Sequence, residues 1–177
     1  MVWDQLTDHL EVLYGAAAAL VIVLVLTPAV GSAARHLRLV DRRAEGDRER
    51  SSVPRLGGLA MFLGVIVPSV AFLHLSGPMK GIVLGAAVAT TVGAIDDFRR
   101  LPWWQKLGGQ FLAAAIPAVG FDVYLQRFTF VGVFDIPKWL GVPMTVIGIV
   151  AVMNMVNFLD GLDGLASGVC AIAGATF

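Results

Sequence analysis

Charged side chains are scarce in this sequence. Asp, Glu, Lys and Arg make up 15% of its 177 residues, whereas a soluble domain usually has about 25%. The charges are also unevenly spread, because residues 12–34 and 56–75 contain none of these four residue types. A membrane-spanning helix needs about 20 predominantly apolar residues. We therefore expect an all-α polytopic membrane protein and not a soluble domain with long buried helices.

Three further absences narrow the class of protein. The single cysteine, Cys170, cannot form an internal disulfide, and its place in an apolar run indicates a small packing residue. The N-terminal stretch MVWDQLTDHLEVLYG lacks the basic segment that opens a secretory signal peptide, so the first span should stay in the protein. The net charge of zero gives no reason to expect a nucleic-acid partner.

The apolar segments predict five transmembrane helices and the start of a sixth. The spans are residues 12–34, 56–75, 79–95, 107–121 and 140–158, and the sixth begins at residue 165. Pro117 is expected to kink the fourth span. Residues 122–139 are rich in β-branched and aromatic side chains, which predicts a short periplasmic hairpin lying on the membrane surface.

The basic residues predict the orientation. Ten of the thirteen Lys and Arg residues follow the first or the third span, and three lie on the opposite side. Because basic loops stay in the cytoplasm, the N-terminus should be outside the cell and the Arg-rich loops inside. The loop after the fifth span then also faces the cytoplasm. Four acids that were not used in this argument, Asp96, Asp97, Asp160 and Asp163, therefore come to the same membrane surface.

The last apolar run, residues 165–177, is too short to cross a bilayer. As a helix it would measure about 20 Å, whereas the hydrocarbon core is roughly 30 Å thick. We therefore expect residues 1–177 to be the N-terminal portion of a single multi-span domain in a longer protein.

Asp96 and Asp97 stand side by side at the predicted cytoplasmic end of the third span. Ionised carboxylates there oppose the helix dipole, repel each other and lose hydration near the bilayer. A divalent cation would remove these penalties, and Mg²⁺ prefers a few carboxylates together with phosphate oxygens. A solvated helix end paired with the two following arginines is an equal alternative. Lys106 then opens the fourth span, where it could snorkel to the surface or hold a phosphate, and Gln110 points the same way.

A second polar stretch, NMVNFLDGLDGLASG, follows the fifth span. Asn154, Asn157, Asp160 and Asp163 are spaced three residues apart. Each such step drifts by about 60° around a helix, so a continuous helix would place the first and last members on opposite faces. The glycine after each aspartate can break the helix and let both carboxylates enter one cavity.

A third motif, PRLGG, stands where the Arg-rich loop enters the second span. It contains Arg55, Gly57 and Gly58. Paired glycines allow a close helix approach or a tight turn. Alone, this motif favours a structural role.

Three patterns thus stand in order: PRLGG, then DD followed by K-x-x-x-Q, then N-x-x-N-F-x-D-G-x-D-G-L-A-x-G. Together they resemble the polyprenyl-phosphate N-acetylhexosamine-1-phosphate transferases of the glycosyltransferase 4 type. The similarity is closest to the undecaprenyl-phosphate GlcNAc-1-phosphate transferase branch, which starts O-antigen, teichoic acid and related envelope polymers. It is weaker to the muramoyl-pentapeptide branch, where a Thr commonly replaces Leu159.

The resemblance implies a reaction at the cytoplasmic face of the inner membrane. A sugar 1-phosphate passes from a UDP-N-acetylhexosamine to undecaprenyl phosphate, UMP is released, and Mg²⁺ or Mn²⁺ takes part. The two substrates and the bilayer are the implied partners, and a homodimer is left open. Both a covalent route through an aspartate and direct attack by the lipid phosphate also stay open.

The resemblance also implies roles for the polar residues. The aspartates would be catalytic, and the first three would bind the metal; the other residues would bind substrate. The catalytic set is Asp96, Asp97, Asp160 and Asp163, and the substrate-binding set is Asn154, Asn157, Lys106, Arg55, Gly57 and Gly58.

Two departures from the family pattern bear on activity. The loop RRAEGDRERSS lacks the Arg-Lys-x-His stretch that such proteins often carry before the glycine pair. The family's second half, which supplies a further aspartate and a His-containing loop, would follow residue 177. We therefore expect residues 1–177 alone to be inactive.

The main alternative is a membrane transporter or ion-conducting component whose interfacial carboxylates carry protons or cations. Such a protein would place its acids in mid-span and favour inverted repeats. Here the acids stand at span ends on one side, and no clear repeat is present. The DG-x-x-A-R element of CDP-alcohol phosphotransferases and the DD-x-x-D element of prenyl synthases are also missing.

Overall fold

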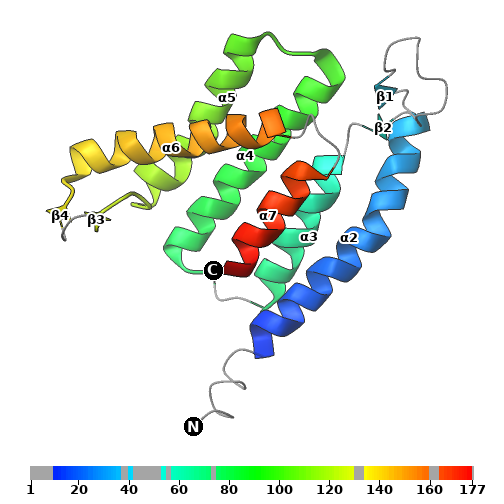
Figure 1. Cartoon of the computed structure of the whole chain (residues 1–177), viewed down its shortest axis with the longest axis horizontal. Helices are drawn as coiled ribbons and strands as arrows, with labels where there is room; N and C mark the ends of the chain where they lie inside the picture. The colour runs from blue at the N-terminus through cyan, green and yellow to red at the C-terminus, as the bar shows by residue number, and fades with distance from the viewer. Residues whose placement is uncertain are drawn as a thin grey trace.

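The computed structural model describes residues 10–36, 40–41, 53–54, 57–72, 75–129, 134–159 and 164–176. Helices dominate these ranges (Figure 1). The helices are α2 (Leu10–His36), α3 (Gly57–Phe72), α4 (Gly77–Arg99), α5 (Trp103–Ala115), the π-helix η1 (Ile116–Gly120), α6 (Lys138–Leu159) and α7 (Leu165–Thr176). The strands form two antiparallel pairs, β1 (Val40–Asp41) with β2 (Val53–Pro54) and β3 (Arg127–Phe128) with β4 (Phe134–Asp135).

Each apolar segment identified in the sequence coincides with a helix. Within the described ranges, three helices are long and apolar enough to cross a membrane: residues 13–33 of α2, all of α4 and all of α6. The other apolar helices are shorter, since α3 has 16 residues and α7 has 12. The helical class of the protein is therefore confirmed, and the five crossings and their orientation stay predictions.

The predicted hairpin is present between η1 and α6. Strands β3 and β4 pair Arg127 with Asp135, and the Nε of this arginine lies 3.2 Å from an Oδ1 of the aspartate. The backbone N–H of Leu125 donates to the hydroxyl of Thr145 in α6 at 2.8 Å. This bond ties the segment that leads into the hairpin to the first turns of α6.

The predicted disturbance at Pro117 is also present. Helix α5 gives way to a π-helix at Ile116, and Pro117 is the second residue of that π-helix. Proline has no backbone N–H and crowds the carbonyl one turn earlier, which disfavours regular α-helix hydrogen bonding at this point.

The packed interior consists of small side chains, whereas large apolar ones face outward. Among the described residues, the buried hydrophobic ones are Ala60, Ala113, Ala114, Ala118, Val150 and Ala166. Leu24 is 64% exposed and Phe158 is 86% exposed. A soluble protein buries its large apolar residues, whereas helices in lipid associate through small residues that let backbones approach. Together with the long apolar helices, this distribution identifies a helical membrane protein.

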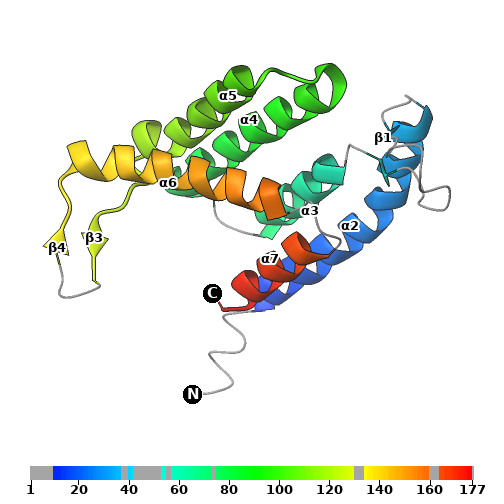
Figure 2. The ribbon, with the colours of Figure 1, turned by 45° about the horizontal axis from the view of Figure 1, so that its top comes forward.

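Helices α4 and α5 lie side by side, and α6 crosses them (Figures 1 and 2). Glycines permit the close approach of α4 and α5. A Cβ added at Gly85 would lie 2.7 Å from the carbonyl oxygen of Ala113, and one added at Gly109 would lie 2.7 Å from the Cγ1 of Val92. The pairing sets the end of α4 opposite the start of α5, where the predicted polar residues stand.

We expect Gly85→Ala to destabilise the protein by roughly 1–3 kcal/mol, because its new methyl group would push against rigid backbone. Thermal unfolding in detergent, followed by circular dichroism, measures this effect. Gly108→Ala is the matched control, since its Cβ would meet nothing within 4 Å and alanine favours a helix. An equal response of the two variants would contradict the proposed role of Gly85.

Candidate functional site

A polar cavity of about 400 Å³ lies where α3, α4, α5 and α6 come together. It gathers predicted site residues that are far apart in the sequence. Helix α3 contributes Gly58, α4 contributes Asp96 and Asp97, α5 contributes Lys106, and α6 contributes Asn157. The expectation that Asp96, Asp97, Asp160 and Asp163 come to one membrane surface stays a prediction, because the last two lie outside the described residues.

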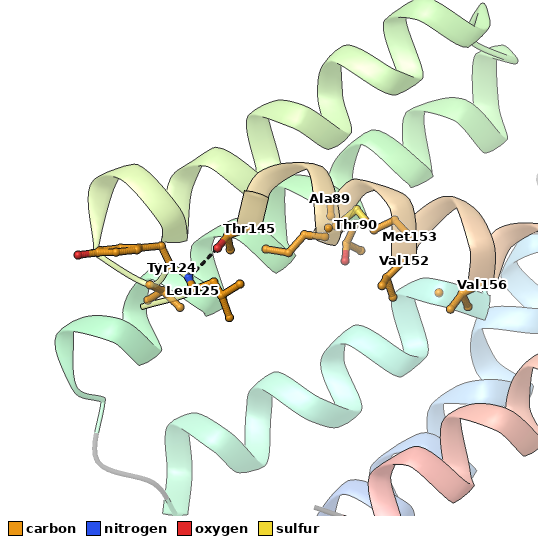
Figure 3. A pocket seen from close by; sticks show the side chains of 12 residues that line it. Ala89, Thr90, Tyr124, Leu125, Thr145, Val152, Met153 and Val156 are labelled. Carbon is orange, nitrogen blue, oxygen red and sulfur yellow. Dashed lines mark hydrogen bonds between the residues drawn. The ribbon is translucent and has the colours of Figure 1, made fainter. Parts of the chain in front are cut away.

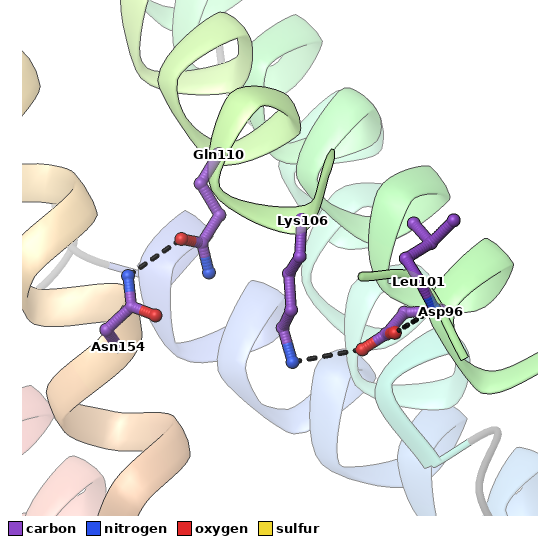
Figure 4. Close-up of polar contacts among 5 residues, drawn as sticks. All are labelled: Asp96, Leu101, Lys106, Gln110 and Asn154. Carbon is purple, nitrogen blue, oxygen red and sulfur yellow. Dashed lines mark hydrogen bonds and ion pairs between the residues drawn. The ribbon is translucent and has the colours of Figure 1, made fainter. Parts of the chain in front are cut away.

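Asp96 lines the cavity and also accepts hydrogen bonds from the turn that follows α4. One carboxylate oxygen, Oδ2, lies 3.0 Å from the Nζ of Lys106, and the other, Oδ1, accepts the backbone N–H of Leu101 at 2.9 Å (Figure 4). The backbone carbonyl of Asp96 accepts the N–H of Arg100 at 2.8 Å. Asp96 therefore closes the turn between α4 and α5.

The ion pair between Asp96 and Lys106 is partly solvated, with side-chain exposures of 22% and 32% respectively. Such a pair contributes about 0–1 kcal/mol to stability, so its main consequence is positional. It holds the ammonium of Lys106 inside the cavity wall. The role of this lysine in holding a phosphate stays a prediction.

Gln110 and Asn154 connect α5 to α6 (Figure 4). The Nδ2 of Asn154 donates to the Oε1 of Gln110 at 2.7 Å and to the carbonyl oxygen of Val150 at 2.8 Å. Of the polar and charged residues that the structure describes, Gln110 is the buried one, with 9% of its surface exposed. Gln110 lines the cavity, and Asn154 is not among the lining residues.

The helix break predicted within the second polar stretch is confirmed. Helix α6 ends at Leu159, and α7 begins at Leu165. Between them, Gly164 has a φ of +81°, a conformation that glycine adopts without the cost that a Cβ would bring. Asn157, in the last turn of α6, faces the polar cavity.

The other predicted site residues are placed as follows. Gly57 begins α3 next to Gly58 and does not line the cavity. Arg55, Asp160 and Asp163 lie outside the described residues, so their predicted roles stay predictions.

The cavity also contains residues that the sequence analysis missed. Thr90 and Gly93 line it together with Asp97. They precede that aspartate by seven and four residues, and this spacing repeats one face of a helix. The spacing could have identified them. Met153 also lines the cavity. It has no polar group, but it precedes Asn157 by four residues, so the same helical spacing could have identified it.

A larger apolar groove of about 1100 Å³ adjoins the polar cavity, and Figure 3 shows the residues that line the groove. Val152 and Val156 of α6 line it at one end, and Tyr124 and Leu125 line it at the other. The two spaces share four lining residues: Gly58, Ala89, Thr90 and Met153. An anionic head group in the polar cavity could therefore carry an apolar chain along the groove.

The donor set of the cavity fits part of a magnesium site. Within the described ranges, no three His, Cys, Asp or Glu side chains converge. Asp96 and Asp97 nevertheless supply two hard carboxylates in one wall, and Mg²⁺ is commonly held by one or two carboxylates plus substrate phosphates.

Most of this chain is similar in sequence to known proteins. Residues 79–177 match the family model described as Glycosyl transferase family 4. The chain is 31% identical over 162 residues to a probable undecaprenyl-phosphate N-acetylglucosaminyl 1-phosphate transferase of Bacillus subtilis, covering 89% of this chain and 45% of that protein. It is 34% identical over 169 residues to a decaprenyl-phosphate N-acetylglucosaminephosphotransferase of Mycobacterium leprae, covering 88% and 42%.

A phospho-N-acetylmuramoyl-pentapeptide-transferase of Desulforudis audaxviator is also similar, with 30% identity over 199 residues that cover 95% of this chain and 60% of that protein. The chain thus spans less than half the length of the first two relatives.

The turn that joins α4 to α5 yields a prediction. Arg100 has a φ of +49°, and a residue with a Cβ pays roughly 1–2 kcal/mol for this left-handed conformation. We expect Arg100→Gly to leave stability unchanged or raise it by up to about 1 kcal/mol, since glycine also gives the unfolded chain more freedom. Thermal unfolding measures the change.

Arg99→Gly is the control, because it removes the same charge one residue earlier, inside the helix. We expect it to lower stability by about 0.5–1 kcal/mol. A greater loss for Arg100→Gly than for Arg99→Gly would contradict this account of the turn.

Proposed function

The chain belongs to glycosyl transferase family 4, and on this premise we propose that it provides the polar site of a polyprenyl-phosphate sugar-1-phosphate transferase. The proposed reaction transfers N-acetylhexosamine 1-phosphate from a UDP-sugar to undecaprenyl phosphate at the cytoplasmic membrane face, and the product starts a cell-envelope polymer. The phosphorus–oxygen bond to UMP breaks, UMP leaves, and a new phosphorus–oxygen bond joins the sugar phosphate to the lipid phosphate.

The position of the polar cavity beside the apolar groove, with four shared lining residues, carries this proposal. A polyprenyl phosphate has an anionic head and a long apolar chain. The cavity offers the ammonium of Lys106 to the head, and the groove offers side chains such as Val152 and Val156 to the chain. Family membership favours the transferase over the transporter alternative.

Charge neutralisation is the main chemical demand of this reaction, because both substrates carry phosphate groups. The ammonium of Lys106 has three N–H donors. One of them can stay on Asp96, which lies 3.0 Å away, and the others are available to phosphate oxygens. Asp96 therefore positions the lysine for an anion that enters the cavity.

The paired carboxylates fit a divalent cation as well. Asp96 and Asp97 would hold Mg²⁺ or Mn²⁺, and Asp160 would be the third protein ligand. When bound, the cation would supply positive charge to the phosphate oxygens. Asn157 lines the same cavity and would orient a phosphate or the nucleotide.

We expect Asp96→Asn, Asp97→Asn and Asp160→Asn each to lower turnover at least about 100-fold. Each substitution removes a carboxylate that would hold the cation, and the cation would neutralise the phosphate oxygens. The variants should be made in the full coding sequence that contains this chain. Transfer of labelled sugar phosphate from UDP-N-acetylglucosamine to undecaprenyl phosphate in the presence of Mg²⁺ measures turnover.

Asp122→Asn is the matched control, because Asp122 pairs with Lys138 on the exposed surface near the hairpin. It should keep normal turnover, and all four variants should insert into the membrane normally. Near-normal turnover in all three site variants would contradict the assignment of the carboxylates.

The groove gives a separate prediction about the acceptor lipid. Gly148 lines the groove, and a Cβ there would meet nothing within 4 Å. We expect Gly148→Leu to place its side chain where the lipid would lie and to raise the KM for undecaprenyl phosphate roughly tenfold, which is the effect of losing a buried apolar contact. The KM for the UDP-sugar should not change.

Gly174→Leu serves as the control, since it also has open space at its Cβ and lies in α7, away from the groove. An unchanged acceptor KM in Gly148→Leu would mean that the lipid chain binds elsewhere.

A further inference from the structure

The bond between Gln110 and Asn154 has a direction that the backbone fixes. The Nδ2 of Asn154 lies 2.8 Å from the carbonyl oxygen of Val150. A carbonyl oxygen can only accept a hydrogen bond, so the Asn154 atom facing it must be the amide nitrogen. The same nitrogen lies 2.7 Å from the side chain of Gln110. Both of its N–H groups are therefore used within the protein.

This direction decides how the side-chain amide of Gln110 is turned. The atom that faces Asn154 must be an acceptor, which is the oxygen Oε1. The nitrogen Nε2 then points the other way, toward the region between Asn154 and Lys106 (Figure 4). Among the hydrogen bonds that the described residues form, none uses this nitrogen.

Gln110 and Lys106 present their polar groups to the same space. They are one helical turn apart on α5, and both line the polar cavity. Gln110 as a whole is almost completely buried. No fully buried side-chain nitrogen of the described residues lacks a partner, so Nε2 keeps some accessible surface and its N–H groups can reach an acceptor in the cavity. An anionic phosphate oxygen beside the ammonium would supply that acceptor.

We propose that Gln110 donates a hydrogen bond from Nε2 to a phosphate oxygen of the substrate, and that Asn154 orients this amide without contacting the substrate. The inference rests on the proposed function and changes the role expected for Asn154 from substrate binding to positioning. The remaining polar atom of Asn154, its Oδ1, is an acceptor, and it would repel a phosphate oxygen.

Gln110→Glu tests the donor in the full-length protein. The substitution keeps the shape and leaves one oxygen to accept from Asn154, but it turns a carboxylate oxygen toward the phosphate. We expect kcat/KM for transfer to undecaprenyl phosphate to fall 10- to 100-fold at about pH 8. Acidification should restore part of this loss relative to the unchanged enzyme, because a protonated carboxyl can donate.

Gln105→Glu is the matched control. It introduces the same charge on the same helix at an exposed position that does not line the cavity. It should stay within twofold of the unchanged enzyme. Equal melting temperatures of the Gln110→Glu variant and the unchanged enzyme would separate loss of the donor from loss of the fold.

A double-mutant cycle distinguishes positioning from contact. If Asn154 acts through Gln110, then Asn154→Ala should lower kcat/KM three- to tenfold alone and have no further effect in a Gln110→Ala background. Losses that multiply would show that Asn154 contacts the substrate itself and would overturn the inference.

Different results would overturn the role of Gln110 and the proposed transferase function. Activity of Gln110→Glu within twofold of an active unchanged enzyme would overturn the role of Gln110 and leave the transferase intact. Inactivity of the unchanged full-length enzyme with every UDP-N-acetylhexosamine and polyprenyl phosphate would overturn the proposed function, and this inference with it.

Discussion

The close approach of α4 and α5 is the contact on which the site depends. It is possible because Gly85 and Gly109 leave room for a carbonyl oxygen and a valine side chain of the opposite helix. In lipid, apolar side chains gain little from leaving their solvent, so close backbone packing must supply the attraction between helices. The pairing then brings the end of α4 to the start of α5, where Asp96 lies 3.0 Å from Lys106. A site built from two neighbouring helices thus needs no long loop to position its charges.

Placing polar groups in an apolar environment costs free energy, and hydrogen bonds and an ion pair within the protein offset this cost in the cavity. Asp96 uses one oxygen for the backbone of the following turn and the other for Lys106, and Gln110 is fixed by Asn154. Within the described residues, no fully buried side-chain nitrogen or oxygen lacks a partner. The side chains that would meet a substrate are therefore held in place by neighbouring groups of the protein, which is the arrangement that a preorganised site requires.

Much of the fold was predictable from local pattern, because span length, a proline and paired glycines each have a local physical effect. The helix bounds, the disturbance at Pro117, the hairpin and the break before Gly164 all follow from such signals. The bond between Gln110 and Asn154 was not predictable, since it joins residues 44 positions apart and depends on how α6 crosses α5. The apolar groove was missed for the same reason: its wall combines ordinary apolar residues from several helices, and none of them differs from a lipid-facing residue in the sequence.

The segment that leads into the hairpin forms part of the groove wall. The sequence predicted a hairpin in residues 122–139, and Tyr124 and Leu125 from this segment also form one end of the groove. Leu125 is held there by the hydroxyl of Thr145, which itself donates to the carbonyl of Gly141. An apolar chain that begins beside the polar cavity would thus extend along α6 toward a segment anchored by hydrogen bonds. The same helix, α6, carries the asparagines at one end and this anchor at the other, so in the proposed function it would link the position of a head group to the path of its chain.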